Sequence, residues 1–283
     1  MNAQVAINKV RNNLRRAPGV EGIVLGGARA IGLHRPSSDI DIRVYYDDSN
    51  FNIQQINEVV TKIDNENRED IIAPIGEWGP WENTGGTLEI GEYQVNLVFR
   101  NIQEVTKAVE DCIAGKFVPY YHRGHPHAFM NTMYIGEISL CRILVDTDNQ
   151  IADLNSKTFP YPEILRDNIT SYFLSESILS LKLAKENMQK GDLSYIVGHC
   201  YRAISSLNQV LFALNGQYCI DEKGAIERIS SFEIKPSDYR VKVDKIFDLL
   251  SIDKDSTEEG LDILEGLVSE TKSLLKETEN PLK

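Results

Sequence analysis

Two aspartates that stand two residues apart, Asp39 and Asp41, are the residues of this chain best suited to chemistry. They belong to the stretch DIDIRVYY, in which Ile40, Ile42 and Val44 alternate with polar residues as in a strand with one buried face. Both carboxylates then point to the other face, with Cα atoms about 7 Å apart. Such a pair ligates one or two hard cations and leaves positions for substrate phosphates. The alternative is that the acids are the solvated face of an edge strand.

A glycine pair precedes these aspartates. The apolar run GIVL ends in Gly26 and Gly27, and residues 28–34 then begin a helix or a tight turn. Backbone N–H groups at such a turn bind phosphate, and glycine lets the backbone approach closely. Arg29 would add positive charge. A phosphate cradle beside metal-binding acids predicts chemistry on a nucleoside triphosphate, although neither a Walker A nor a G-x-G-x-x-G pattern is present.

The stretch VLGG, the eleven residues from Ala28 to Ser38, and then DIDI resemble the signature of the DNA polymerase β-type nucleotidyltransferase superfamily. Such a domain followed by helices is similar to the small-molecule adenylyltransferases that act on aminoglycosides and lincosamides. The resemblance implies one or two Mg²⁺ ions on the two aspartates. It also implies transfer of a nucleoside monophosphate, with ATP as the first choice of nucleotide, to an acceptor hydroxyl. The residues expected to hold the nucleotide are Gly26, Gly27, Ala28, Arg29, Ser38 and, from the helical part, Lys223, for which an exposed loop lysine is the alternative.

Two positions depart from that signature. Ala28 stands where many members have serine, and Asn96 stands where the family has a third acid. Asparagine has a carbonyl ligand but no negative charge, and it cannot take a proton. The stretch TLEIGEYQVNLVFR is predicted to form a hairpin turning at Gly91-Glu92, which places Glu89 diagonal to Asn96 on one face. Glu89 is therefore the candidate general base, with an ordinary exposed strand residue as the alternative.

Further candidates for substrate contact lie in loops and in one ambiguous segment. Trp81 either stacks on a ring or anchors a Gly- and Pro-rich loop. His125 and His127 in YYHRGHPHAF contact substrate, bind a metal or form a structural turn. Glu137 is a second candidate base, with a place on a helix surface as its alternative. Asn96 is also an expected substrate contact.

The fold class predicted is an α/β (α+β) nucleotidyltransferase domain with a mixed sheet, followed by an all-α helical bundle. The boundaries expected are residues 1–155 and 156–283. The bundle helices are predicted at 162–189, 193–214, 237–250 and 257–277. The segment 129–146 carries both helix and strand signals, and its division stays open.

The net charge of −12 argues against general nucleic-acid binding and favours a cationic small-molecule acceptor, such as an antibiotic that the protein would inactivate and so confer resistance. No apolar run is long enough to cross a membrane, and the four cysteines form no C-x-x-C pair, so a cytoplasmic enzyme is expected. Two rival functions remain. One is a nucleotide-binding regulatory module whose turnover is lost through Asn96, and the other is a nucleotidyltransferase that modifies a protein.

Overall fold

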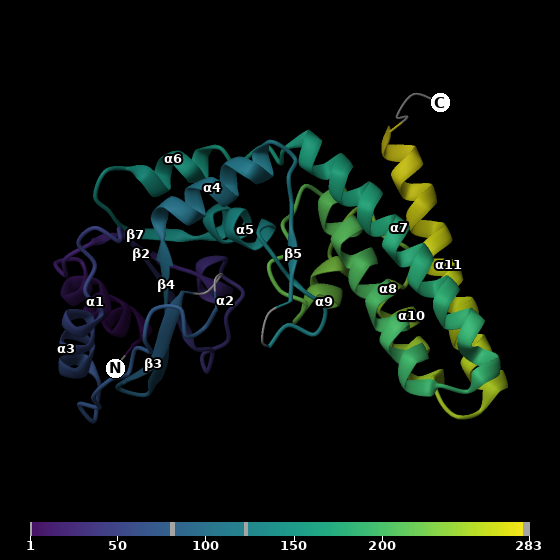
Figure 1. The fold of residues 1–283 in the computed structure, drawn as a ribbon, viewed down its shortest axis with the longest axis horizontal. Helices are drawn as coiled ribbons and strands as arrows, with labels where there is room; N and C mark the ends of the chain where they lie inside the picture. Colours follow the sequence, from purple (N-terminus) through teal and green to yellow (C-terminus); the bar gives the residue numbers. More distant parts are fainter. Residues whose placement is uncertain (1, 80–82, 122–123, 280–283) are drawn as a thin grey trace. The chain divides into compact units, whose positions relative to one another are not determined.

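The computed structural model describes residues 2–79, 83–121 and 124–279. The chain forms two compact units (Figure 1). The first unit comprises residues 1–110 and 134–159, and the second comprises residues 111–133 and 160–283. The chain therefore crosses between the units more than once. The last crossing lies between residues 159 and 160, and the segment 111–133, which was expected in the first domain, enters the second unit from inside helix α4 (Ile102–Ile113).

The first unit contains a five-stranded mixed sheet in the order β3-β4-β2-β1-β7. Strands β2 and β4 are parallel, and the other neighbouring pairs are antiparallel. This arrangement confirms the predicted mixed sheet. The strands are β1 (Val20–Leu25), β2 (Ile40–Tyr46), β3 (Thr84–Ile90), β4 (Tyr93–Asn101) and β7 (Arg142–Asp146).

Two helices cover one face of this sheet, α1 (Ala3–Leu14) and α3 (Ile53–Ile63). Each begins at an asparagine whose side chain accepts hydrogen bonds from the first-turn N–H groups, as is typical of helix N-caps. The alternating residues Ile40, Ile42 and Val44 are fully buried against them. The apolar half of each strand therefore closes the core, and the polar half is left on the opposite face.

The remaining helices of the first unit are α2 (Gly27–Ala30), α4 (Ile102–Ile113), α5 (Thr132–Leu140) and α6 (Gln150–Ser156). The segment that the sequence left undivided forms α5 and then β7. Helices α4 and α5 both pass from one unit to the other. The short helix α6 had no counterpart among the predicted elements.

The second unit is a helical bundle, as predicted from the sequence. Its elements are β5 (Pro119–Tyr120), β6 (Phe129–Met130), α7 (Glu163–Asn187), η1 (Met188–Lys190), α8 (Leu193–Leu214), α9 (Ala225–Ile229), α10 (Tyr239–Leu249) and α11 (Lys254–Glu279). Helices α7 and α8 pack along each other (Figure 1). In the described part of the chain, no helix combines the length and the apolar character that crossing a bilayer requires.

Candidate active site

A row of polar side chains crosses three strands on the face opposite α1 and α3. Asp41 on β2 pairs with Asn96 on β4, and Asn96 pairs with Thr87 on β3. The hydroxyl of Thr87 donates to Oδ1 of Asn96 across 3.0 Å, and Nδ2 of Asn96 donates to Oδ1 of Asp41 across 3.2 Å. The residue at the expected third-acid position therefore fixes the orientation of the Asp41 carboxylate.

A second row of polar residues, Asp39, Gln94 and Glu89, runs parallel to the first. The hairpin has the predicted register, with Glu89 opposite Gln94, and the pairing of Ile40 with Val95 places Gln94 beside Asp39. Glu89 is half-buried and lies two strand spacings from Asp39, which is about 10 Å. At that separation, Glu89 is placed to face an acceptor rather than to share a cation with Asp39.

The glycine turn lies directly against Asp41. The N–H of Gly26 donates to the backbone oxygen of Asp41 across 2.8 Å. Gly27 has a φ of +59°, which side chains disfavour, and a Cβ atom at Gly27 would stand 2.2 Å from Oδ2 of Asp41. Glycine is thus required at this position by both backbone conformation and space. The turn brings the start of α2 beside the carboxylate.

Arg29 holds the loop that carries Asp39. Its Nε donates to the backbone oxygens of Ser38 and Asp39 across 3.1 and 3.0 Å, and its Nη2 donates to those of Ser38 and Pro36 across 2.5 and 3.3 Å. The guanidinium also lies over the ring of Tyr93, 5.5 Å from its centroid. These contacts engage the guanidinium of Arg29 in shaping the loop of residues 36–39.

A cavity of about 650 Å³ opens beside Asp39. Its walls are the loop of residues 36–39 and the hairpin turn at residues 92–94. Ser38, another residue expected to hold the nucleotide, accepts a hydrogen bond from the N–H of Arg35 through its hydroxyl across 2.9 Å. Ligand pockets of roughly 300–1,000 Å³ are usual, so this cavity is large enough for one substrate.

The carboxylates of Asp39 and Asp41 suit a hard cation. Asp39 is exposed, and among the described residues no side chain hydrogen-bonds its carboxylate. Asp41 is half-buried, and the amide of Asn96 is the one described side chain that hydrogen-bonds it. The site therefore offers oxygen ligands with lone pairs still available, which is the chemistry that Mg²⁺ prefers.

Glu137, the second candidate base, is held on α5 between two arginines of the sheet. Its carboxylate accepts from Nε of Arg43 across 3.2 Å and from Nη2 of Arg100 across 3.0 and 3.2 Å. Burial raises the pKa of Glu137, but the charges of Arg100 and Arg43 outweigh burial and hold its pKa below the ordinary value. An ionised carboxylate with both oxygens engaged is suited to anchoring α5 and poorly suited to taking a proton.

Arg43 lies between Glu137 and the candidate site, and no sequence motif assigns it a role. It follows Asp41 by two residues and therefore shares its strand face. Its Nη1 atom is buried and has no hydrogen-bond partner among the described residues. The strand alternation placed Arg43 on the polar face, but Glu137 lies 94 residues away and no local pattern links the two.

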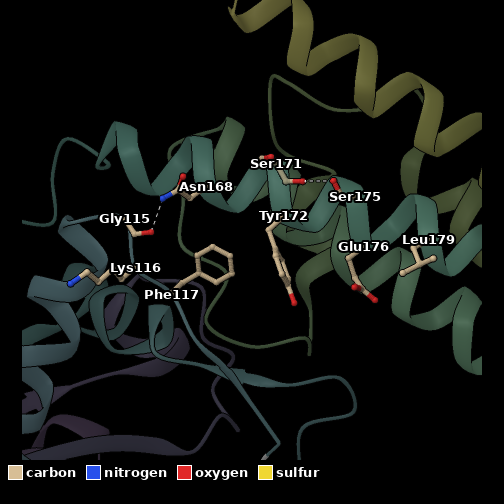
Figure 2. A pocket seen from close by; sticks show the side chains of 9 residues that line it. All are labelled: Gly115, Lys116, Phe117, Asn168, Ser171, Tyr172, Ser175, Glu176 and Leu179. Carbon is tan, nitrogen blue, oxygen red and sulfur yellow. Dashed lines mark hydrogen bonds between the residues drawn. The ribbon is translucent and has the colours of Figure 1, made fainter.

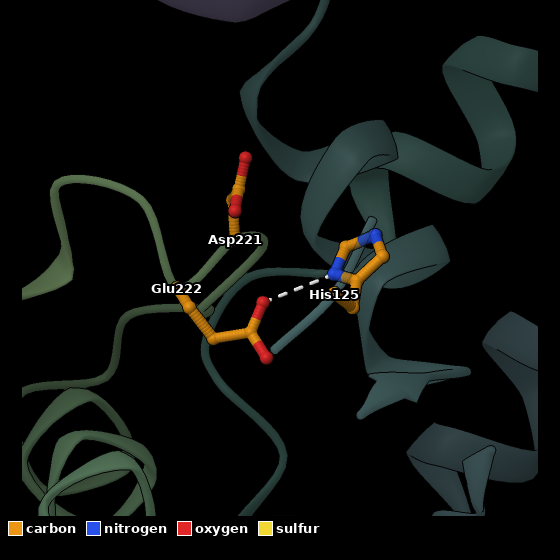
Figure 3. Close-up of side chains that lie close together, drawn as sticks. All are labelled: His125, Asp221 and Glu222. Carbon is orange, nitrogen blue, oxygen red and sulfur yellow. Dashed lines mark hydrogen bonds and ion pairs between the residues drawn. The ribbon is translucent and has the colours of Figure 1, made fainter. Parts of the chain in front are cut away.

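The two histidines lie in the second unit, where they fasten a loop. Nδ1 of His125 lies 3.0 Å from Oε2 of Glu222 (Figure 3). Oε1 of Glu222 accepts from the N–H groups of His127 and Ala128. The side chains of His125, Asp221 and Glu222 come within 4.8 Å of one another, close enough to share a cation. Both oxygens of Glu222 bond residues of the loop 125–128, so Glu222 fastens this loop.

His127 and Lys223 have separate surroundings. Nδ1 of His127 lies 2.9 Å from the hydroxyl of Ser205, and burial lowers the pKa of His127. Lys223 is exposed in a turn where its N–H donates to Oδ1 of Asp221 across 2.9 Å. Both residues belong to the second unit, and Trp81 lies outside the described residues.

The second unit also has an open pocket of about 610 Å³ between α7 and residues 115–117. The rings of Phe117 and Tyr172 meet edge to face with centroids 5.3 Å apart, and the side chain of Glu176 points to the same side (Figure 2). Glu176 is ion-paired with Arg202, which with its hydrogen bond lowers the pKa of the carboxyl. Its volume lies within the range of roughly 300–1,000 Å³ that is usual for pockets that bind small organic molecules.

Comparison with protein families gives one match, which lies almost wholly in the first unit. Residues 7–112, which contain β1 to β4 and both aspartates, match the model of the nucleotidyltransferase domain family. Among solved structures, a nucleotidyltransferase-like protein from Exiguobacterium sibiricum 255-15 is similar, with 14% sequence identity and a TM-score of 0.46, over 99% of this chain and 80% of that chain. No curated protein matches the chain.

Proposed function

We propose that the first unit transfers a nucleoside monophosphate, AMP from ATP as the first choice, to a hydroxyl group of a small-molecule acceptor. The observation that carries the proposal is the contact of the Gly26-Gly27 turn with Asp41. That turn and the Asp39–Asp41 pair lie in a region that matches the nucleotidyltransferase domain family. A phosphate-binding turn that touches a metal-binding carboxylate is what such a transfer needs.

Each part of the site has a separate role in the proposed transfer. Backbone N–H groups of the glycine turn would bind the β- and γ-phosphates, except that of Gly26, which donates to the backbone oxygen of Asp41. Asp39 and Asp41 would hold Mg²⁺, which neutralises charge on the phosphates when it is bound. The amide of Asn96 keeps Asp41 in one orientation. The acceptor oxygen attacks the α-phosphorus, the bond to the bridging oxygen breaks, and pyrophosphate leaves while Glu89 takes the hydroxyl proton.

The acceptor is expected to be small and cationic. The net charge of −12 favours the collection of positively charged molecules and disfavours nucleic acids. Aminoglycoside-like and lincosamide-like compounds fit this description, and an antibiotic is therefore one acceptor class to test. A neutral or anionic acceptor that binds well would remove the argument from charge.

One observation favours a second candidate function, nucleotide binding without turnover. Asn96 occupies the position of an expected acid, and its Nδ2 donates to Asp41. An amide at this place supplies no negative charge for a second cation and cannot accept a proton. A protein-modifying transferase uses the same site residues, and it differs only in the acceptor.

Labelled ATP separates these functions. The protein is incubated with Mg²⁺ and ATP that carries the label on its α-phosphate, together with either the small-molecule or the protein fraction of a cell extract. Label in a small molecule supports the proposal, and label on a protein supports the protein-modifying alternative. Bound nucleotide with no transferred label supports the binding module. A variant with both Asp39→Asn and Asp41→Asn is the control that should abolish transfer.

A further inference from the structure

Trp78 lies against a glycine of the edge strand β3. A Cβ atom built at Gly85 would stand 2.4 Å from Cζ3 and 2.6 Å from Cη2 of this indole, and 2.5 Å from the backbone oxygen of Leu97 on the neighbouring strand. The six-membered part of the indole therefore occupies the place that a side chain at position 85 would take. Glycine at this position lets the ring pack directly against the strand.

The indole lies on the polar face of the sheet. Side chains alternate between the two faces of a strand, so Gly85, Thr87 and Glu89 share one face and Gly86 and Leu88 share the other. Leu88 is fully buried in the core on the other face. Thr87 is the end of the row that begins at Asp41, and Trp78 therefore lies one residue pair further along that face.

If the proposed function holds, the order of the strands indicates where the leaving pyrophosphate and the acceptor lie. The glycine turn ends β1, Asp41 lies on β2, Asn96 on β4 and Gly85 on β3, which is their order across the sheet. In-line displacement places the leaving pyrophosphate and the attacking hydroxyl on opposite sides of the α-phosphorus. With pyrophosphate at the glycine turn and the α-phosphate at Asp41, the acceptor extends toward β4 and β3.

We propose that Trp78 is the surface on which a ring of the substrate stacks, and that this ring belongs to the acceptor. This inference rests on the proposed function and adds a substrate class, a hydroxyl compound that contains at least one ring. Trp78 is half-buried, so a part of its side chain remains accessible to a ligand. Indole rings stack on flat rings and attract cations, which agrees with the acidic charge of the chain. The nucleobase is the other ring that this site could receive.

Tryptophan emission distinguishes the two rings. The chain has two tryptophans, so Trp81→Phe leaves Trp78 as the single source of signal, and Trp78→Phe is the matched control. One probe is AMPCPP, which is ATP with a methylene bridge between its α- and β-phosphates, added with Mg²⁺. The other is the p-nitrophenyl ester of AMP, which carries a ring on the acceptor side of the phosphate.

We expect the ester to quench the emission of Trp78 at least twofold and AMPCPP to leave it nearly unchanged. Quenching by AMPCPP alone would overturn the assignment to the acceptor and identify the ring as the nucleobase. If calorimetry shows that both probes bind and neither changes the emission, Trp78 is not a stacking surface. Failure of both probes to bind would instead count against the proposed function.

Affinities give a second readout. Because stacking on an aromatic side chain stabilises a bound ring, Trp78→Ala should weaken ester binding roughly tenfold. Trp78→Phe keeps a ring and should weaken it only about threefold. Both variants should bind AMPCPP as the unchanged chain does. Equal ester affinities in Trp78→Ala and the unchanged chain would contradict the inference.

Discussion

Gly27 and Asp41 touch so closely that no side chain fits between them. A Cβ atom at Gly27 would stand 2.2 Å from Oδ2 of Asp41, and the φ of Gly27 is +59°. The N–H of Gly26 holds the same strand residue through its backbone oxygen. The turn at the end of β1 and the carboxylate on the next strand, β2, therefore form one structural feature.

Gly27→Ala tests whether that feature binds phosphate. The added methyl group would displace the Asp41 carboxylate, and we expect Mg²⁺–AMPCPP affinity to fall at least about tenfold. The left-handed backbone should also cost about 1 kcal/mol of unfolding free energy. Gly191→Ala is the control, because Gly191 has a φ of +70° but no atom within 4 Å of its Cβ position. Equal nucleotide affinities in the two variants would contradict a special role for Gly27.

Asn96→Asp restores the acid that the family resemblance implies. The new carboxylate would face Oδ1 of Asp41 where the amide now donates, so the two anions should repel each other in the absence of metal. We expect a lower midpoint of thermal unfolding without Mg²⁺ and a larger rise on adding Mg²⁺ than in the unchanged chain. Scanning calorimetry at several Mg²⁺ concentrations measures both. A midpoint that does not respond more strongly to Mg²⁺ would place the cation elsewhere.

Glu89→Gln separates catalysis from binding. If Glu89 takes the acceptor proton, its loss should lower the rate of pyrophosphate release about a hundredfold or more. The affinity for Mg²⁺–AMPCPP should stay the same, because Glu89 lies on β3, away from the two aspartates. Pyrophosphate release and calorimetry on the same preparation give the two numbers. An unchanged release rate would end the assignment of Glu89 as the base.

Glu137→Gln should destabilise the fold. Removing the carboxylate breaks the ion pairs of Glu137 with Arg43 and Arg100, and breaking a buried ion pair typically costs about 3–5 kcal/mol. Because the pKa of Glu137 is lowered on folding, its contribution is present above the unfolded value of about 4.5 and is lost as pH falls. Urea unfolding at pH 7 and pH 4 should therefore show a smaller pH effect in Glu137→Gln than in the exposed control Glu110→Gln. Equal pH effects would contradict this role.

The parts of the fold that follow from local patterns could be predicted from the sequence. Alternation at Ile40, Ile42 and Val44 predicted the buried face of β2, and the turn at Gly91-Glu92 set the register of the hairpin. The contact between Asp41 and Asn96 required more, because it depends on parallel pairing of strands that are distant in sequence. The sequence shows only that both residues are polar and stand on the polar faces of their strands.

Other features had no local signal at all. The anchor of Glu137 joins residues from β2, β4 and α5, and only the fold brings these elements together. Trp78 gains its place from the missing side chain of Gly85, which reads in the sequence as one glycine in a glycine-rich loop. The entry of residues 111–133 into the second unit begins within α4, where periodicity continues without a break.

The most direct test of the central claim is a calorimetric titration of AMPCPP with and without Mg²⁺. The unchanged chain is compared with Asp41→Asn and with Asp70→Asn, an exposed aspartate whose positive φ asparagine tolerates. The account predicts binding that requires Mg²⁺, persists in Asp70→Asn and is lost in Asp41→Asn. Binding that ignores both Mg²⁺ and Asp41, or no binding of any nucleotide analogue, would contradict it and leave the two aspartates as an ordinary strand face.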